Sequence, residues 1–173
     1  MEPKTIVLPK ITTNAVEYSL LVTSFLIPFF ISGPQLLTGT LVNTLLFLFV
    51  SQTNSKKAFS IILLPSIGAV LNGILFGKFT VFLLYFLPFI WVGNYALMYS
   101  FKLLLKKTTF FVSILISSLL KFTILFSVAY FFTATKIVPT IFSQLMGWSQ
   151  LYTALMGGVL AFGIHTIITK KND

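Results

Sequence analysis

Residues 82–91, FLLYFLPFIW, are apolar at every position, and so are residues 45–50, LLFLFV. A strand of a membrane barrel alternates apolar and polar side chains, so neither run fits such a strand. Both runs belong to longer apolar segments of the kind that cross a bilayer as helices. The sequence therefore predicts an all-α membrane protein.

The composition of the whole chain agrees with this class. Of its 173 residues, 57% are hydrophobic and only 9% are charged, whereas a soluble domain carries about 25% charged residues. At roughly 20 residues per span, the length allows about six spans and no sizeable soluble domain. We therefore expect residues 1–173 to form a single membrane domain.

Six apolar segments are separated by polar or lysine-bearing breaks. They cover about residues 14–31, 36–52, 58–76, 79–105, 109–133 and 148–169. The predicted fold is a compact bundle of six transmembrane helices in a polytopic membrane protein.

The lysines are divided unevenly between the two predicted membrane faces. One face carries nine of them: Lys4, Lys10, Lys56, Lys57, Lys102, Lys106, Lys107, Lys170 and Lys171. The other face carries Lys78 and Lys136. Because lysines are in excess in cytoplasmic loops, we expect a multi-pass protein of the cell membrane with both termini in the cytoplasm. A nucleic-acid partner is not expected, since its binding needs lysines clustered on a solvated domain.

The twelfth lysine, Lys121, lies inside an apolar run, SSLLKFTILF (residues 117–126). It is about 12 residues from either end of its span and therefore near the membrane midplane. A lysine at this depth costs about 2.5 to 3.5 kcal/mol, so its ammonium should face the interior of the bundle. Two interpretations are open. Lys121 is either a helix–helix fastener, neutralised or hydrogen-bonded to helix carbonyls and Ser/Thr hydroxyls, or a site for a ligand or ion.

The acidic residues do not offer Lys121 an obvious partner. They number three, Glu2, Glu17 and Asp173, and Glu17 falls near the inner end of the first span. This distribution favours an incoming anionic group over a permanent ion pair.

Other polar side chains interrupt the apolar spans, namely Asn43, Asn72 and Asn94. Trp91 and Tyr95 stand one turn apart and flank Asn94. An amide offers donors and an acceptor, and aromatic rings offer a stacking surface. We predict that Lys121, Asn94, Trp91 and Tyr95 line one pocket, and that Gln35 and Asn72, the latter in the outer part of its span, also bind the ligand. The alternative is that each asparagine bonds to a neighbouring helix.

Two outer connections bear on access to such a pocket. The turn at residues 31–39, ISGPQLLTG, is compact and presents Gln35 either as part of a lid or as a plain connector. The segment at residues 134–147, ATKIVPTIFSQLMG, is semi-apolar. It either lies along the membrane interface or covers an outward-facing cavity.

Small residues recur at intervals of four in the first span, at Ala15, Ser19 and Thr23. Such a row lets another helix approach closely, either within the bundle or from a partner protein. A similar row in the last span, made of Ala154, Gly157, Gly158 and Ala161, is expected to pack the bundle.

No catalytic or metal-binding pattern is present in the sequence. There is no cysteine and one histidine, His165, and no metalloprotease, phosphate-loop or nucleophile–histidine–acid pattern occurs. We therefore predict no enzymatic activity, no metal and no cofactor.

Three segments and the overall architecture resemble a known family: residues 32–49, SGPQLLTGTLVNTLLFLF, residues 63–75, LLPSIGAVLNGIL, and residues 87–94, LPFIWVGN. They resemble those of the substrate-binding S components of energy-coupling factor (ECF) transporters. The resemblance covers the whole chain as architecture, without a sharp motif. It implies capture of a vitamin or similar micronutrient at the outer face. It also implies docking onto a membrane coupling protein that two cytoplasmic ATPases drive.

The resemblance also implies roles for particular residues. Ala15, Ser19 and Thr23 would form the docking row, although two of these places hold hydroxyl residues where the family has alanines. Gln35 would belong to the lid, and Asn94 and Lys121 to helices that form the ligand cavity. The expected function is thus substrate capture for an uptake transporter. The alternatives are a structural or assembly subunit of a larger membrane complex without a ligand and, third, a membrane-embedded enzyme.

Overall fold

A computed structural model of the chain describes residues 13–31, 33–53, 57–76 and 80–170. Within these ranges six long helices are joined by turns and one short irregular segment, and no strand occurs. The elements are α1 (Thr13–Phe30), α2 (Gln35–Gln52), α3 (Ala58–Phe76), α4 (Thr80–Leu105), α5 (Phe110–Ala134), α6 (Ile141–Ser143), a π-helical turn η1 (Gln144–Trp148) and α7 (Ser149–Lys170). The predicted all-α bundle is confirmed, and every predicted span end agrees with its helix to within one residue.

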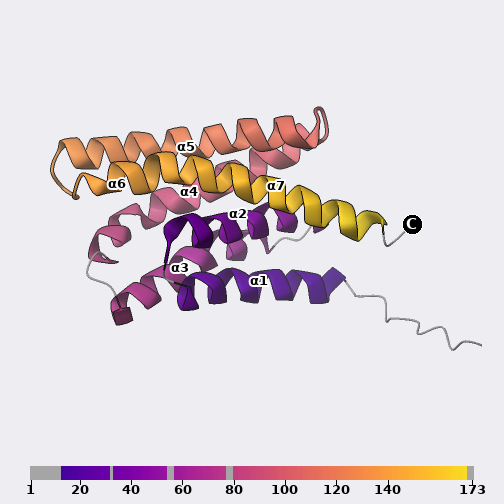
Figure 1. Cartoon of the computed structure of the whole chain (residues 1–173), viewed down its shortest axis with the longest axis horizontal. Coiled ribbons are helices and arrows are strands. Elements are labelled where there is room, and N and C mark those ends of the chain that lie inside the picture. Colours follow the sequence, from indigo (N-terminus) through magenta and orange to yellow (C-terminus); the bar gives the residue numbers. More distant parts are fainter. Residues whose placement is uncertain (1–12, 32, 54–56, 77–79, 171–173) are drawn as a thin grey trace, which may run out of the picture.

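The helices run side by side and alternate in direction (Figure 1). The start of α1, the α4–α5 turn and the end of α7 lie at one end of the bundle. We call this the basic end, because Lys102, Lys106 and Lys107 surround the α4–α5 turn. The opposite end carries the α1–α2 turn and the α5–α6 connection, which contains Lys136. Five lysines used in the orientation prediction lie outside the described residues: Lys4, Lys10, Lys56, Lys78 and Lys171.

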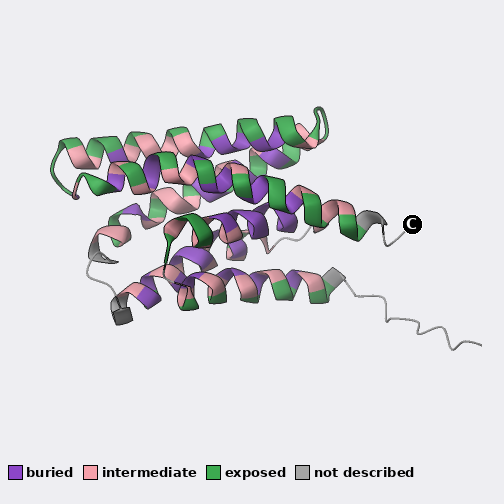
Figure 2. Cartoon of the chain, in the orientation of Figure 1, coloured by how far each residue is buried: buried purple, intermediate pink, exposed green. Residues whose placement is uncertain are grey.

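Four helical stretches are long and apolar enough to cross a membrane: Gln35–Gln52, Phe82–Leu105, Phe110–Ala134 and Ile141–Ile168. The apolar stretches of α1 and α3 are shorter, Asn14–Phe30 and Ala58–Gly73. Large apolar side chains are exposed on the outer faces of α4, α5 and α7, among them Leu84, Leu119 and Val159 (Figure 2). Extended apolar surface of this kind marks contact with a membrane or a partner. These features support membrane association.

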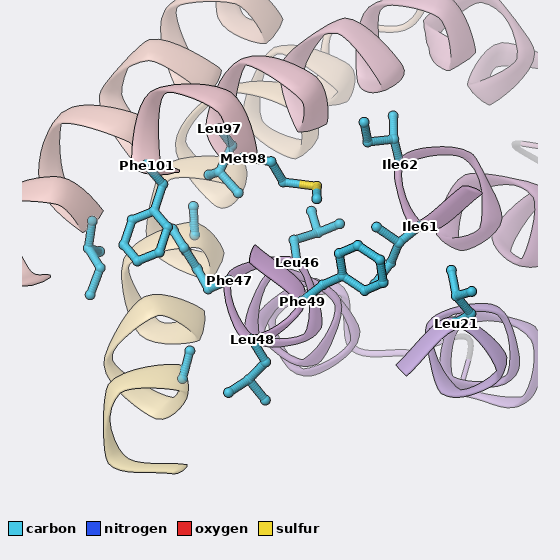
Figure 3. Close-up of a cluster of buried hydrophobic side chains, with 13 residues drawn as sticks. Leu21, Leu46, Phe47, Leu48, Phe49, Ile61, Ile62, Leu97, Met98 and Phe101 are labelled. Carbon is cyan, nitrogen blue, oxygen red and sulfur yellow. The ribbon is translucent and has the colours of Figure 1, made fainter. Parts of the chain in front are cut away.

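The main hydrophobic core fills the half of the bundle nearer the basic end. Figure 3 shows Phe47 and Phe49 of α2 within this cluster, with Ile61 of α3 and Phe101 of α4. The rings of Phe47 and Phe101 meet edge to face, with 4.8 Å between their centroids. A second, smaller cluster that includes Phe86, Phe142 and Met146 packs toward the opposite end.

Close contact between α2 and α7 depends on Gly157. A Cβ atom at this position would lie 2.8 Å from the Thr40 carbonyl oxygen, the Thr44 amide nitrogen and the Asn43 Cβ of α2. No side chain fits in so short a distance without a shift of the α2 backbone. The prediction that the small residues of the last span pack the bundle is confirmed at Gly157.

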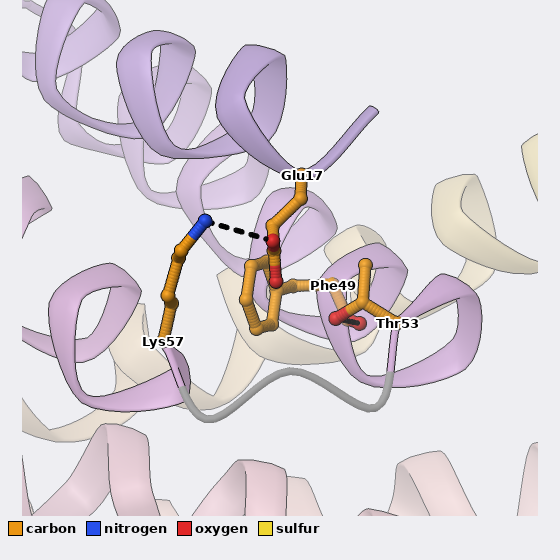
Figure 4. Close-up of polar contacts among 4 residues, drawn as sticks. All are labelled: Glu17, Phe49, Thr53 and Lys57. Carbon is orange, nitrogen blue, oxygen red and sulfur yellow. Dashed lines mark hydrogen bonds and ion pairs between the residues drawn. The ribbon is translucent and has the colours of Figure 1, made fainter. Parts of the chain in front are cut away.

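An ion pair links α1 to the start of α3. The Nζ of Lys57 lies 3.1 Å from the Oε2 of buried Glu17, and Figure 4 shows Phe49 of α2 and Thr53, the residue after α2, beside them. Hydrogen bonds to Tyr18 and to Glu17 raise the pKa of Lys57 above its usual value. The carboxylate of Glu17 is therefore engaged far from the middle of α5. As predicted, it does not partner Lys121.

Candidate functional site

A partly open cavity of about 480 Å³ lies in the half of the bundle away from the main core. Its lining comes from the end of α1, the first half of α2, the second part of α3, the middle of α4 and α5, and the α6–η1–α7 segment. Its volume falls in the range of about 300 to 1,000 Å³ that encloses small organic ligands. The polar residues of the lining are Gln35, Thr38, Asn43, Ser66, Asn72, Asn94, Lys121 and Gln150. Three of them, Asn43, Asn94 and Lys121, lie about half-way along their helices and form what we call the floor.

Lys121 reaches this floor from the middle of α5. Lys121 is only 3% exposed. Its Nζ donates a hydrogen bond of 2.7 Å to the Oδ1 of Asn43 on α2. Asn43 is neutral, so it orients the ammonium without cancelling its charge. Within the described residues the only carboxylate is that of Glu17, which pairs with Lys57. No carboxylate of the described residues therefore balances a charge on Lys121.

The local structure of α2 sets the orientation of the Asn43 amide. Its Nδ2 donates to the carbonyl oxygen of Gly39 at 2.8 Å and to the Oγ1 of Thr153 at 3.2 Å. Because both amide hydrogens are used in this way, the Oδ1 is left to accept from Lys121. In the sequence, Asn43 is a polar residue in an apolar span, but it is not part of the predicted site. Its amide, in an otherwise apolar run, was the signal available.

Asn94 lies on the same floor, on α4. It is 2% exposed, and its Nδ2 donates to the carbonyl oxygen of Ile62 on α3 at 3.2 Å. Its Oδ1 is buried and has no hydrogen-bond partner in the described part of the chain. The next residue toward the N-terminus, Gly93, holds α4 close to α5, since a Cβ there would lie 3.4 Å from the Cγ of Lys121. Asn94 and Lys121 thus occupy neighbouring positions on two packed helices.

The two aromatic residues predicted for the pocket are placed differently. The Nε1 of Trp91 donates to the Oγ of Ser66 at 2.7 Å, and Ser66 itself lines the cavity. Contrary to the prediction, Trp91 is therefore not itself part of the cavity lining but holds the lining residue Ser66 in place. Tyr95 is 55% exposed and stacks on Tyr99 outside the cavity, with 5.6 Å between the ring centroids. The prediction that Tyr95 lines the pocket is wrong, because one residue along a helix turns the side chain by about 100° away from Asn94.

Gln35 and Asn72 line the outer part of the cavity, as the sequence suggested. The Nε2 of Gln35 donates to the carbonyl oxygen of Leu145 at 2.7 Å, which joins the start of α2 to η1. The Nδ2 of Asn72 donates to the carbonyl oxygen of Phe29 at 2.6 Å. Both amides therefore hold together the elements that surround the cavity.

Residues 134–147 contribute directly to the cavity wall. Phe142, Leu145 and Met146 all belong to its lining. Gly147 has a non-helical backbone in η1, and a Cβ there would lie 2.6 Å from the ring of Phe126 on α5. Of the two interpretations of this segment, the one in which it covers the cavity agrees with the structure.

The row of small residues on α1 faces away from the cavity. Ala15 and Ser19 are exposed, and Thr23 is half-buried. Among the described elements, α1 packs mainly against α3 and α2. The first two members of the row are therefore free to contact lipid or a partner protein.

His165 lies near the basic end, away from the floor. Its Nδ1 is 2.8 Å from the Nε2 of Gln52, and its ring stacks on Phe110. Within the described ranges, no three residues of the types His, Cys, Asp and Glu come together in a way that would hold a metal ion.

Comparison with known proteins identifies no relative of this chain. No protein-family model, curated protein or solved structure matches the chain. The arrangement of the site therefore has to be interpreted from its own chemistry. A buried cation, two amides and apolar walls form a site that can bind a small anionic molecule.

Proposed function

We propose that this chain is the substrate-capture subunit of a membrane uptake transporter and that its cavity binds a small ligand with an anionic group. The observation that carries the proposal is the Lys121 ammonium. It is buried at the cavity floor, and a neutral amide is its one hydrogen-bond partner within the described residues.

The energy of a buried charge supports binding over a purely structural role. Placing a lysine at the centre of a membrane helix costs about 2.5 to 3.5 kcal/mol. One hydrogen bond to a charged group returns about 1.5 to 3 kcal/mol. A structural fastener would compensate better through a carboxylate and would need no cavity of about 480 Å³ beside it. A bound anion supplies the missing charge and fills the space.

The proposed direction of capture follows from the lysine distribution. The basic end carries Lys102, Lys106 and Lys107, and the cavity lies toward the opposite end. If the basic end faces the cytoplasm, as lysine-rich segments do, then the cavity opens outward. Outward opening is what a receptor for an external nutrient requires.

Orientation can be tested by labelling single cysteines, because the parent chain has none. We expect a membrane-impermeant maleimide to label Lys136→Cys in intact cells. Lys106→Cys, in the α4–α5 turn, should react only after the cells are permeabilised. The reverse pattern would place the cavity on the cytoplasmic side and would overturn capture from outside.

The proposed partners come from the resemblance to ECF S components. In such a system a membrane coupling protein and two cytoplasmic ATPases move the captured ligand inward. The exposure of Ala15 and Ser19 on α1 supports this proposal, because a docking row must be accessible. The ligand would then be a vitamin or similar micronutrient.

Native mass spectrometry of the full chain, purified from its own membranes, tests the proposal. We expect one small anionic molecule bound to the chain, and ATPase subunits in the same preparation. An empty chain that co-purifies with partners other than ATPases would contradict capture. It would support the alternative, a structural or assembly subunit docked through the same row on α1.

A further inference from the structure

Two groups at the cavity floor have unused hydrogen-bonding capacity. The Lys121 ammonium has three hydrogens and, among the described residues, one acceptor, the Oδ1 of Asn43. The Oδ1 of Asn94 is buried and accepts no hydrogen bond. Most buried polar side-chain atoms have a partner, so the unpaired oxygen of Asn94 needs an explanation.

The unused atom of Asn94 is an oxygen for a structural reason. The NH₂ end of the Asn94 amide donates to the carbonyl oxygen of Ile62 at 3.2 Å. Of the two ends of an amide, only the NH₂ can donate a hydrogen bond, so the oxygen must point the other way. An inverted amide would place two acceptors against each other. Asn94 therefore presents an acceptor, so a molecule that satisfies it must bring an N–H or O–H donor.

The acceptor and the ammonium belong to residues that line the same cavity, on two helices that pack against each other. Gly93 brings α4 against the stem of Lys121, with only 3.4 Å between its ideal Cβ position and the Lys121 Cγ. Because both residues line one cavity, a single ligand can contact both of them. A positively charged donor is disfavoured there, because it would add a second cation near the ammonium.

We propose, building on the proposed function, that the ligand is an acid with a neutral hydrogen-bond donor close to its carboxylate. The carboxylate lies on Lys121, and the hydroxyl, amide or ring N–H donates to the Oδ1 of Asn94. The apolar remainder points toward Phe142 and Met146 near the opposite end. Simple fatty acids, which the surrounding bilayer supplies in abundance, are rejected because they leave Asn94 unpaired.

Binding of three acids that share the phenylacetate carbon skeleton tests this proposal. Phenylacetate has no donor, mandelate adds a neutral hydroxyl beside the carboxylate, and phenylglycine replaces that hydroxyl with an ammonium. Hexanoate, 2-hydroxyhexanoate and 2-aminohexanoate repeat the comparison on an alkyl skeleton. Affinities are measured by equilibrium dialysis with the full chain in lipid nanodiscs.

We expect the hydroxy acid to bind about tenfold or more tightly than the plain acid, because a buried acceptor left unpaired is costly. The amino acid should bind more weakly than the hydroxy acid. Asn94→Leu should bring the hydroxy acid and the plain acid to within about twofold of each other. Tyr95→Leu, a change at the neighbouring exposed residue, should keep the parent's preference.

The outcomes separate this inference from the function on which it rests. If the parent binds the plain and hydroxy acids equally, or prefers the amino acid, the neutral-donor inference fails while anion capture stands. If the parent prefers the hydroxy acid and Asn94→Leu retains that preference, the role of Asn94 fails. If no acid of either skeleton binds, both the inference and the proposed function are overturned.

Discussion

Lys121→Met is expected to lower the affinity for an anionic ligand by about 100-fold or more, equivalent to about 2.7 kcal/mol. The ammonium is the one cation that the described structure brings to the cavity floor. Truncating one partner of a buried, hydrogen-bonded charge pair costs about 2 to 5 kcal/mol of binding energy. Equilibrium dialysis of mandelate against parent and variant measures the change.

The same substitution should leave the fold as stable as before, or more stable. Methionine removes the cost of a lysine at the membrane centre, about 2.5 to 3.5 kcal/mol. It also leaves the Oδ1 of Asn43 without its donor, at a cost of about 1 to 3 kcal/mol. These two terms cancel or favour the variant. The thermal unfolding midpoint of the full chain in nanodiscs should therefore not fall.

The combination of lost binding and retained stability distinguishes a ligand site from a structural fastener. If Lys121 held α5 to α2, Lys121→Met would unfold at a clearly lower temperature, with no specific effect on ligand affinity. Lys106→Met is the matched control, because it removes an exposed lysine from the basic end. It should change neither quantity.

Gly157→Ala is expected to destabilise the chain by about 2 kcal/mol, although alanine is the better helix former. The new methyl group would stand 2.8 Å from backbone atoms of Thr40 and Thr44. Overpacking of this kind typically costs about 1 to 3 kcal/mol, because α7 and α2 must separate. The shift would also displace Asn43 and hence the ammonium that it orients.

Gly163→Ala provides the comparison on the same helix. Nothing lies within 4 Å of an ideal Cβ at this position, so the change should stabilise α7 by about 0.5 to 1 kcal/mol. The two alanine variants should therefore shift the thermal unfolding midpoint in opposite directions. Equal upward shifts would show that α2 and α7 do not approach each other as closely as described.

The helices themselves were predictable from the sequence. All six predicted spans match a helix to within one residue at each end, because a span is set by local features: an unbroken apolar run and the polar residues that end it. The burial of Lys121 was predictable for a similar reason, since a charge at that depth has no favourable lipid-facing position. The places of Gln35, Asn72 and Asn94 in the lining also agree with the prediction.

Predictions of which side chains face the cavity were less successful, because they depend on how each helix is rotated about its own axis. Tyr95 is close to Asn94 in sequence, yet it faces outward and stacks on Tyr99. Asn43 lies 78 residues from Lys121 in sequence and still supplies its hydrogen-bond acceptor. A strongly amphipathic helix would reveal which side faces inward. These helices are apolar on every side, so periodicity carries little information about rotation.

The amino-acid sequence thus dictated the number of long helices, their ends and the need to shelter one charge, because each follows from the apolar runs and the polar residues that interrupt them. The neighbours of that charge were decided by tertiary packing alone. Gly157 lets α2 approach α7, the Gly39 carbonyl and Thr153 orient the Asn43 amide, and its oxygen then meets Lys121. Contacts between distant segments depend on how whole helices fit together, and no local pattern records that fit.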